Sequence, residues 1–333
     1  MDLIEVKNVS KHFKVPERDT GIRGGLKYIF KPKFTDFQAV KDVTFSVRKG
    51  DIMGFIGKNG AGKSTTIKMM TGILSPTSGE ILIDGMNVEK NRRIISRKFG
   101  VVFGQRTQLW WDIPVIDTYN IFKELYKISD EEYKNNLKLF DDILELNTFL
   151  KKPARQLSLG QRMRADLAAS LLHNPDILFL DEPTIGLDIS VKEKVRNFIK
   201  TINQDRGVTI ILTTHDIDDI ERLSKDIIVI DKGNILFRGD IEDLKDNYGK
   251  ITTIIIHGKI DKVEQLKSVF HGYDIRVSYN EQIIVEFNKS DYSVSEVMNK
   301  ILSVPDIQEF NIIETSLEDI VRKIYDSDQG VLL

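Results

Sequence analysis

Cysteine is absent from the chain, and so is any apolar run long enough to cross a membrane. Without cysteine, disulfides and zinc sites built on thiolates are excluded. A membrane-spanning helix needs about 18 or more consecutive apolar residues, a length that no run here approaches. The N-terminus, starting at Met1, lacks the basic region and apolar core of a secretory signal. We therefore expect any work at a membrane to depend on a partner protein.

A large excess of charge of either sign is also missing. The 333 residues include 48 Lys and Arg against 50 Asp and Glu, for a formal net charge of −2. Proteins that hold nucleic acid by bulk electrostatics are usually basic, so no nucleic-acid partner is expected. The length predicts about two domains, because a domain usually contains about 100–200 residues.

Short apolar runs alternate with helical patterns in the first part of the chain, which is typical of a mostly parallel α/β sheet. The predicted buried strands are Ile52–Ile56, Ile81–Ile83, Val101–Phe103, Ile177–Leu180, Thr209–Leu212 and Ile227–Ile230. Residues from 104 to about 173 contain no strand-like run, which predicts a helical subdomain. Residues 16–36, rich in Lys, Arg and Gly, form an insertion that interrupts the predicted N-terminal strands.

A small second domain, residues 247–333, is predicted to follow a first domain of residues 1–246. Its pattern is strand, helix, strand, strand, helix, strand, helix, which resembles a ferredoxin-like α+β unit. The predicted elements are Ile251–Ile256, Lys262–Phe270, Ile275–Tyr279, Gln282–Phe287, Val294–Leu302, Ile307–Ile313 and Leu317–Tyr325.

A glycine-rich segment follows the first buried strand. Residues 57–64 fit the phosphate-loop pattern G-x-x-x-x-G-K-[ST], and a predicted helix runs from them to about Thr71. Glycine lets backbone N–H groups turn inward around phosphate oxygens, and the helix N-terminus adds partial positive charge. We expect Lys63 to contact the β- and γ-phosphates and Ser64 to bind Mg²⁺. A structural glycine-rich turn is the alternative.

The apolar strand that begins at Ile177 is predicted to end in two acidic residues, Asp181 and Glu182. Ligands of parallel sheets bind at the carboxyl ends of the strands. Adjacent strand residues point in opposite directions, so the two acids need separate roles. We assign Asp181 to the Mg²⁺ ion and Glu182 to the attacking water as general base. In the alternative, Glu182 only caps the following loop.

Residues 157–161, with the sequence LSLGQ, precede a predicted amphipathic helix. Its apolar positions recur with a helical period at Leu159, Met163, Leu167, Ala168, Leu171 and Leu172. Ser158, with Gln161 three residues later, predicts a capping box. Taken alone, the segment indicates only a well-capped helix.

The order of these motifs resembles the ATP-binding cassette family. That family has a P-loop, a glutamine loop, an LSGGQ signature, an acidic strand, a D-loop and a switch histidine. The corresponding residues here are 57–64, Gln105, 157–161, Asp181 with Glu182, Gly186–Asp188 and His215, so the resemblance spans roughly residues 1–245. One departure is Leu159, where the common form has glycine.

The resemblance implies an α/β fold: a P-loop ATPase core with a mostly parallel sheet, an antiparallel β subdomain and a helical subdomain, followed by the ferredoxin-like domain. It implies ATP and Mg²⁺ as ligands, with the metal held by Ser64, Gln105 and Asp181. The implied catalytic residues are Glu182, His215 and Gln105. The implied nucleotide contacts are Phe13, Gly57, Lys58, Asn59, Gly60, Ala61, Gly62, Lys63, Ser64, Thr65, Ser158, Gly160, Gln161 and Asp188. The alternatives are core packing for Phe13 and a structural role for His215.

In the family, the signature residues face the ATP of an opposite subunit, which implies a head-to-tail dimer of identical or different ATPase subunits. Residues 105–112 (QRTQLWWD) and the 16–36 insertion resemble a bacterial export branch that includes daunorubicin-type drug exporters and polysaccharide exporters. This branch implies a transmembrane permease as partner and a peripheral position on the cytoplasmic face of the membrane.

Other cassette ATPases act on DNA or ribosomes, or bind ATP as regulatory scaffolds. The DNA type carries a long coiled coil and the ribosomal type two cassettes, whereas this sequence has no heptad run and one cassette. The presence of Lys63, Asp181, Glu182 and His215 argues against a scaffold. Trp110, Trp111 and the basic insertion predict docking surfaces, with packing inside the helical subdomain and a solvated loop as the alternatives.

Overall fold

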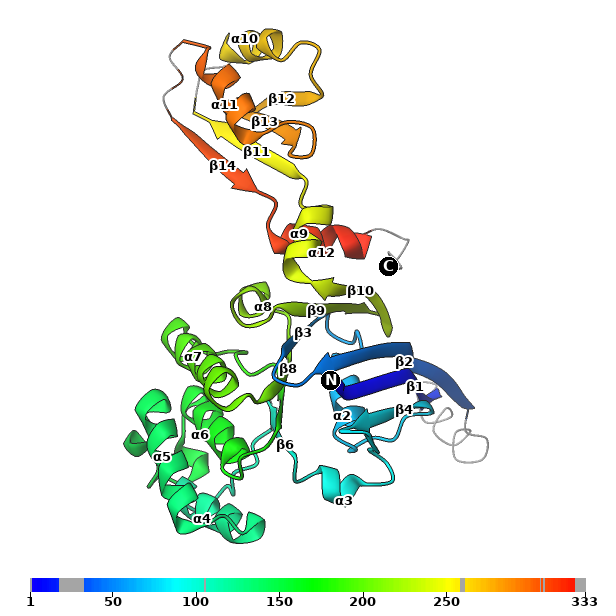
Figure 1. The fold of residues 1–333 in the computed structure, drawn as a ribbon, viewed down its shortest axis with the longest axis vertical. Helices are drawn as coiled ribbons and strands as arrows, with labels where there is room; N and C mark the ends of the chain where they lie inside the picture. Colours follow the sequence, from blue (N-terminus) through cyan, green and yellow to red (C-terminus); the bar gives the residue numbers. More distant parts are fainter. Residues whose placement is uncertain are drawn as a thin grey trace, which may run out of the picture. The chain divides into compact units, whose positions relative to one another are not determined.

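The computed structural model describes residues 2–17, 33–104, 106–257, 261–305, 307 and 309–326. They divide into two compact units, one running to Arg238 and one beginning at Gly239 (Figure 1). Gln105 and most of the predicted insertion, residues 18–32, lie outside the described residues. Within the described ranges, no helix is both long enough and apolar enough to cross a membrane.

A six-stranded sheet forms the centre of the first unit, in the order β10-β9-β3-β8-β7-β6. Its strands are β3 (Ile52–Ile56), β6 (Phe99–Phe103), β7 (Ile177–Asp181), β8 (Thr209–Thr214), β9 (Asp226–Asp231) and β10 (Asn234–Asp240). The strands from β9 to β6 pair in parallel. They are apolar runs because parallel strands are covered on both faces. The predicted parallel sheet is confirmed for five of the six predicted strands, whereas Ile81–Ile83 belongs to the antiparallel sheet described next. The carboxyl ends of β3, β8 and β7 lie side by side.

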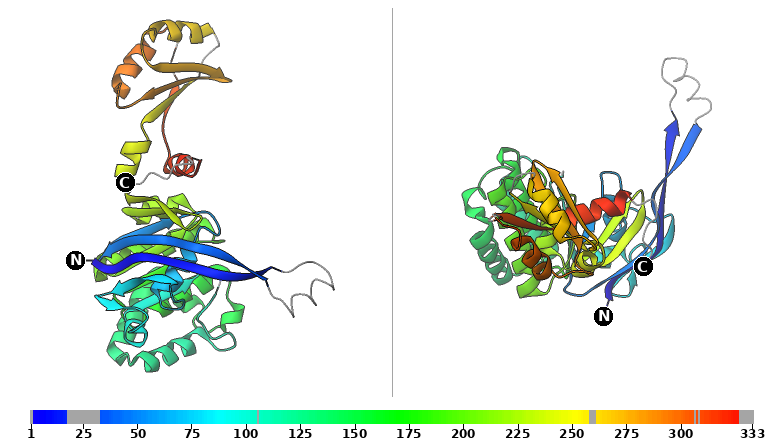
Figure 2. Two further views of the ribbon diagram at one scale, coloured as in Figure 1. Left: turned by 90° about the vertical axis from the view of Figure 1, so that its right-hand side faces the viewer. Right: turned by 90° about the horizontal axis from the view of Figure 1, so that it is seen from above.

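A second sheet of this unit is antiparallel, in the order β2-β1-β4-β5. Its strands are β1 (Asp2–Glu17), β2 (Lys33–Arg48), β4 (Ser78–Ile83) and β5 (Met86–Asn87). β1 and β2 pair from Asp2 opposite Arg48 to Glu17 opposite Lys33, and Figure 2 shows this hairpin extending well past β4. Both ends of the predicted insertion therefore continue the strands, because residues such as Phe34 and Thr35 favour extended backbone.

The helices of the first unit follow the order of the chain. They are α2 (Lys63–Met70), α3 (Arg92–Ile95), α4 (Val115–Tyr126), α5 (Asp130–Leu144), α6 (Leu159–Leu171), α7 (Ile189–Arg206) and α8 (Ile217–Leu223), with 3₁₀ turns at Leu146–Thr148 and Ala154–Gln156. α4, α5 and α6 lie between β6 and β7 in the chain, where the sequence predicts helices. α6 contacts β6, α4 and α5, so it is buried on several faces and not on a single apolar stripe.

The main core lies where the two sheets face α2. It joins apolar residues of β1, β2 and β4 to residues of β3, β7 and β8. Phe45 of β2 meets Phe55 of β3 edge to face, with ring centroids 5.3 Å apart. This core fixes β3, and therefore the loop that follows it, against both sheets.

The second unit has a four-stranded antiparallel sheet in the order β12-β13-β11-β14. Its elements are α9 (Ile241–Tyr248), β11 (Ile251–Ile256), α10 (Asp261–Val269), β12 (Ile275–Asn280), β13 (Gln282–Asn288), α11 (Val294–Leu302), β14 (Phe310–Glu314) and α12 (Leu317–Asp326). This is the predicted ferredoxin-like order. α9 contacts α12, so the unit begins at Gly239 and not at the predicted residue 247.

Candidate functional site

A glycine-rich loop, residues 57–62, connects β3 to α2 at the carboxyl edge of the parallel sheet. A Cβ on Gly57 would lie 2.7 Å from the carbonyl oxygen of Ile230. A Cβ on Gly62 would lie 2.7 Å from that of Ala39, and Gly62 has a φ of 113°. Both positions therefore require glycine. α2 has no side-chain cap and no acidic residue in its first turn, so its first N–H groups are left for an anion.

Lys63 begins α2, and only 4% of its surface is exposed. Its Nζ donates to the carbonyl oxygen of Gly57 at 2.5 Å and lies 3.7 Å from Oε1 of Glu182. Burial lowers the pKa of Lys63, whereas the charges of Glu182 and Asp181 raise it. The ammonium group is held inside the loop, where it can bind a phosphate oxygen.

Ser64, Asp181 and Thr213 form a hydrogen-bonded group where α2, β7 and β8 meet. Ser64 Oγ donates to Oδ1 of Asp181 at 2.9 Å, and Thr213 Oγ1 donates to the same oxygen at 2.6 Å. Mg²⁺ prefers oxygen ligands and usually takes one or two carboxylates together with phosphate oxygens. Among the described residues, no three or more His, Cys, Asp and Glu gather to hold a metal. The hydroxyl of Ser64 and the carboxylate of Asp181 fit Mg²⁺ that is shared with a phosphate, because both are oxygen ligands.

Glu182 lies between Lys63 and His215. Its Oε1 is 3.7 Å from Nζ of Lys63 and 3.6 Å from Nδ1 of His215, and its side chain is 16% exposed. β7 ends at Asp181, and Glu182 has a φ of 55°, which side chains rarely adopt. The prediction that both acids are neighbours on one strand is therefore wrong, because the backbone turns at Glu182. Such strained backbone is common at functional sites.

A cavity of about 400 Å³ lies beside Ser64, Asp181 and Glu182. Its lining includes Asn59, Ser64, Lys68, Phe103, Gly104, Arg106, Asp181 and Glu182. Gln105 lies outside the described residues, but its neighbours Gly104 and Arg106 both line the cavity. A Cβ on Gly104 would lie 2.5 Å from the carbonyl oxygen of Glu182, so the chain passes close to that acid only because residue 104 is glycine. Lys58, Asn59 and Gly60 form the exposed part of the loop, whereas Ala61 is buried and Thr65 lies on α2.

Ser158, Gly160, Gln161 and Asp188 are not part of that lining. Ser158 Oγ accepts from the backbone N–H of Gln161 at 3.2 Å, and Gln161 Oε1 accepts from the N–H of Ser158 at 3.1 Å, so the predicted capping box is confirmed. Asp188 caps α7 by accepting from the N–H of Val191 at 2.9 Å. A Cβ on Gly160 would lie 3.2 Å from Val191. The N-termini of α6 and α7 therefore lie next to each other.

Leu159 does not join the buried face that the helical period predicts for it. Its surface is 43% exposed, and it lines a second cavity of about 250 Å³ with Met163, Ile185 and Gly186. A Cβ on Gly186 would lie 3.1 Å from Leu159. The first turn of α6 projects beyond the packed part of the helix, which leaves this side chain at the surface.

A buried network that sequence reasoning missed lies behind the site. Asp219 of α8 is fully buried and accepts hydrogen bonds from Thr184, Thr214 and Arg196. Thr184 lies two residues after the strained acid, and Thr214 directly precedes the histidine. The network therefore fixes the backbone beside Glu182 and beside His215, whose side chains lie next to each other. Asp219 is one of two acidic residues in the first turn of α8, which begins at Ile217, so the sequence alone does not distinguish it from an ordinary charge at a helix N-terminus.

Three aromatic residues singled out from the sequence lie outside the core. Phe13 on β1 is partly exposed and lies opposite Phe37 of β2. Trp110 and Trp111 are 54% and 49% exposed, and the guanidinium group of Arg162 lies 4.9 Å from the centre of the Trp111 ring. Burial in the core therefore does not account for these side chains.

Comparisons with known proteins identify the family. The family model described as ABC transporter matches residues 40–185. An ABC transporter ATP-binding protein of Clostridium acetobutylicum is 34% identical over 213 residues, which cover 63% of this chain and 76% of the relative. The methionine import ATP-binding protein MetN of Lactobacillus delbrueckii subsp. bulgaricus is 27% identical, over 100% of this chain and 90% of the relative.

A solved structure agrees with this family. It is the dimeric post-hydrolysis state of an ATP-binding cassette bound to ADP and Pi, with a TM-score of 0.60, 26% identity, and coverage of 72% of this chain and 98% of that chain. The chain belongs to the ABC transporter family. It is an ATP-binding ATPase subunit of that family, and its ligands are ATP and Mg²⁺.

Proposed function

We propose that this chain hydrolyses MgATP as one half of a head-to-tail dimer and thereby drives export through a separate membrane permease. The position of Glu182 carries the proposal. Its carboxylate lies beside the buried Lys63 and beside His215, at the mouth of a loop suited to phosphate. A base next to a phosphate-binding lysine is the arrangement that water-dependent phosphoryl transfer needs.

Each residue assigned to the site has a defined task in this proposal. The N–H groups of the loop and Lys63 bind the β- and γ-phosphates. Ser64 and Asp181, with Gln105, would hold Mg²⁺, which supplies charge neutralisation at the phosphates. Glu182 accepts a hydrogen bond from the attacking water and takes its proton, and His215 donates to the γ-phosphate. We also propose that Phe13 stacks on the adenine ring and that Thr65 contacts a phosphate.

The signature residues act on the ATP of the second subunit. Ser158 and Gln161 lie at the exposed N-terminus of α6, outside the cavity that the P-loop lines. A helix N-terminus attracts anions, so it can close the open side of a nucleotide held by another chain. Gly160 lets the backbone approach, and Asp188 lies at the adjacent N-terminus of α7. The dimeric cassette among the structural neighbours supports this arrangement.

Mixing two inactive variants tests the head-to-tail dimer. Lys63→Ala disables the P-loop, and Ser158→Arg disables the signature, so each variant alone should lack turnover. In the mixed dimer one site combines the intact P-loop of one chain with the intact signature of the other. We expect ATPase activity to reappear on mixing, up to about half the native rate per mixed dimer. A mixture that stays as inactive as its components would rule out the proposed dimer.

The permease and the direction of transport rest on surface residues and on the export-branch resemblance of residues 105–112. The half-exposed Trp110 and Trp111 provide a hot-spot surface. In inverted vesicles that contain the permease, ATP reaches this subunit from outside. An exporter should then load cargo into the vesicle, whereas an importer should empty it.

A further inference from the structure

Asp166 on α6 is a buried carboxylate that the chemistry above does not use. It lies about two turns after the start of the helix, and 4% of its surface is exposed. Its Oδ1 accepts from Thr107 Oγ1 and from the backbone N–H of Gln108, both at 3.0 Å. These two donors belong to the segment that directly follows Gln105. One carboxylate oxygen thus ties the signature helix to that segment.

Further contacts join the backbone of α6 to the same segment. Nε2 of Gln108 donates to the backbone carbonyl of Asp166 at 2.9 Å. One residue earlier on the helix, the carbonyl of Ala165 accepts from the hydroxyl of Tyr119 at 2.8 Å. One turn earlier again, Arg162 stacks over Trp111. α6 is therefore joined to residues 107–119 at successive turns.

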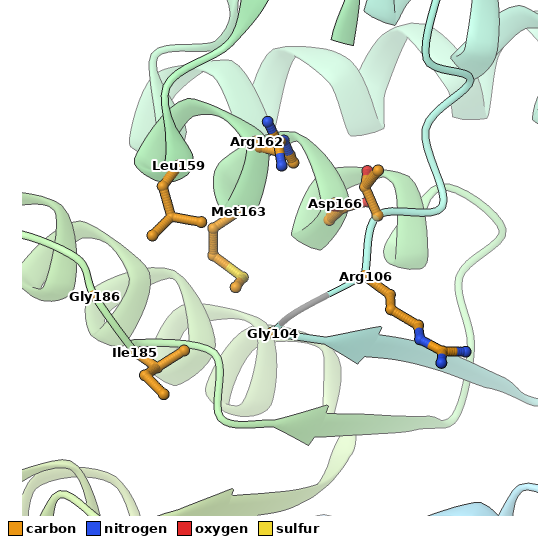
Figure 3. A pocket seen from close by; sticks show the side chains of 9 residues that line it. Gly104, Arg106, Leu159, Arg162, Met163, Asp166, Ile185 and Gly186 are labelled. Carbon is orange, nitrogen blue, oxygen red and sulfur yellow. The ribbon is translucent and has the colours of Figure 1, made fainter. Parts of the chain in front are cut away.

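The first turns of α6 also border the second cavity, and its lining includes both Asp166 and Thr107 as well as Leu159 and Met163. This cavity, about 250 Å³, is large enough for several waters. Figure 3 shows Leu159 and Met163 of α6 on one side of it, Ile185 on the other, and Asp166 next to the strand-to-loop segment that carries Arg106. Leu159 and Met163 face Ile185 across the cavity through apolar side chains only, whereas the hydrogen bonds of Asp166 tie α6 to Thr107 and Gln108.

We propose that Asp166 is a positioning residue that makes the segment after Gln105 and the signature helix move as one piece. The proposal rests on the dimer proposed above, in which the second copy closes on nucleotide through Ser158. Closure at the signature would then set the position of Gln105, and contact at Trp111 would be transmitted to Ser158. ATP affinity of the single chain is not involved, because Lys63 and Ser64 are held by other elements.

The protonation state of Asp166 gives this role a specific readout. Burial raises the pKa of Asp166 to about 7, although the hydrogen bonds from Gln108 and Thr107 and the charge of Arg162 lower it. The other groups that face it are Arg106, which lines the same cavity, and Tyr119 of α4, whose pKa is raised well above its usual value by burial. Asp166 therefore titrates near neutral pH, and the charged form is the stronger hydrogen-bond acceptor.

Three variants test the proposal in the full chain. Asp166→Ala removes the acceptor, Thr107→Val removes one donor while keeping the shape, and Asp166→Asn keeps an oxygen acceptor without the charge. Ser170→Ala is the matched control, because Ser170 is buried in the same helix but donates only to the carbonyl of Leu167. The readouts are kcat and KM for ATP between pH 6 and 8.5.

We expect Asp166→Ala to lower kcat at least about tenfold with KM within about twofold, and Thr107→Val to have a smaller effect of the same kind. Asp166→Asn should fold, recover part of kcat, and flatten the rise of kcat between pH 6 and 8. Wild-type kcat in both Asp166 variants, or a native pH profile in Asp166→Asn, would overturn the proposal. The mixing experiment with Lys63→Ala and Ser158→Arg then separates the two proposals. If activity is recovered on mixing, the proposed dimer stands and only the role of Asp166 is wrong. If no activity is recovered, the proposed dimer itself is wrong.

Discussion

Nζ of Lys63 lies 3.7 Å from Oε1 of Glu182, so the proposed phosphate-binding cation and the proposed general base share one space. Each side chain therefore influences the other. The carboxylate helps to keep the buried lysine charged, and the lysine holds the carboxylate at the mouth of the loop. The two residues nevertheless have separable roles, because one contacts phosphate and the other contacts water.

Glu182→Gln should retain ATP binding but lower kcat by about 100-fold or more, because the amide has a similar shape but cannot take a proton. ATP-bound dimer should accumulate and be visible by size-exclusion chromatography. Lys63→Ala should instead weaken ATP binding. Glu124→Gln, an exposed position on α4, is the matched control and should turn over normally. A native rate in Glu182→Gln would remove the general-base assignment.

A chain that stops after Asp240 should bind ATP with a Kd within about threefold of the full chain, because the proposed site ends at His215. Stopping at Asp246 is a worse choice, because it cuts α9, in which Leu244 is fully buried. The later stop should therefore give the less soluble product. Circular dichroism checks folding, and a folded chain ending at Asp240 that fails to bind ATP would show that the second unit contributes to the site.

Trp111→Ala should reduce co-purification with membranes that contain the permease. Basal ATPase of the isolated chain should change little, because the hydrogen bonds of Asp166 and Tyr119 still join α6 to residues 107–119. The exposed indole is suited to a partner contact, and its loss also removes the stacking of Arg162, worth about 0.5–1 kcal/mol at an exposed site. Tyr279→Ala, another exposed aromatic change, is the control in the second unit.

A companion variant neutralises the basic insertion at Arg23, Lys27, Lys31 and Lys33, of which only Lys33 lies within the described residues. It should also weaken recovery with membranes, because basic residues favour an anionic surface. If both variants bind membranes normally while their ATPase falls, these residues support the fold and do not dock.

Asp166 should make stability depend on pH. Its pKa is about 7 in the folded chain and near the ordinary aspartate value when unfolded, so the folded state holds the extra proton. The stability from this proton is fully present below about pH 4 and is lost as pH rises to about 7, at up to about 1.4 kcal/mol per pH unit. Urea unfolding at pH 5, 6, 7 and 8 should therefore show that the free energy of unfolding of Asp166→Asn rises relative to that of the wild type as pH rises. Parallel curves for the two proteins would contradict a raised pKa.

The buried parallel strands could be predicted closely from the sequence. Ile52–Ile56 is found with the predicted bounds, because a strand covered on both faces is a continuous apolar run that stops where the sheet stops. The long β1–β2 hairpin could not be predicted in the same way. Its outer part is exposed, with residues such as Val15 and Phe37 half in solvent, so no apolar pattern marks its length.

Contiguous site motifs were also accessible, since Lys63 and Ser64 follow one another and Asp181 ends an apolar strand. Contacts between segments that are distant in the sequence could not be predicted. Thr213 reaches Asp181 only because β8 pairs with β7, which no local pattern specifies. Asp166 carried a usable signal, because it falls on the same helical stripe as Met163 and Ser170, where an exposed acid would be out of place.

Among the residues that the structure describes, the cap of α6 uses the hydroxyl of Ser158 only as a hydrogen-bond acceptor. Its oxygen accepts from Gln161, and a hydroxyl that accepts in this way still has its hydrogen to give. Aspartate caps helices as well as serine does, but it has no hydrogen to give and adds negative charge. Selection for folding alone would therefore accept Ser158→Asp, whereas selection for a nucleotide shared between two chains would reject it. A screen for stability should therefore accept Ser158→Asp, whereas a screen for growth that depends on the transporter should reject it.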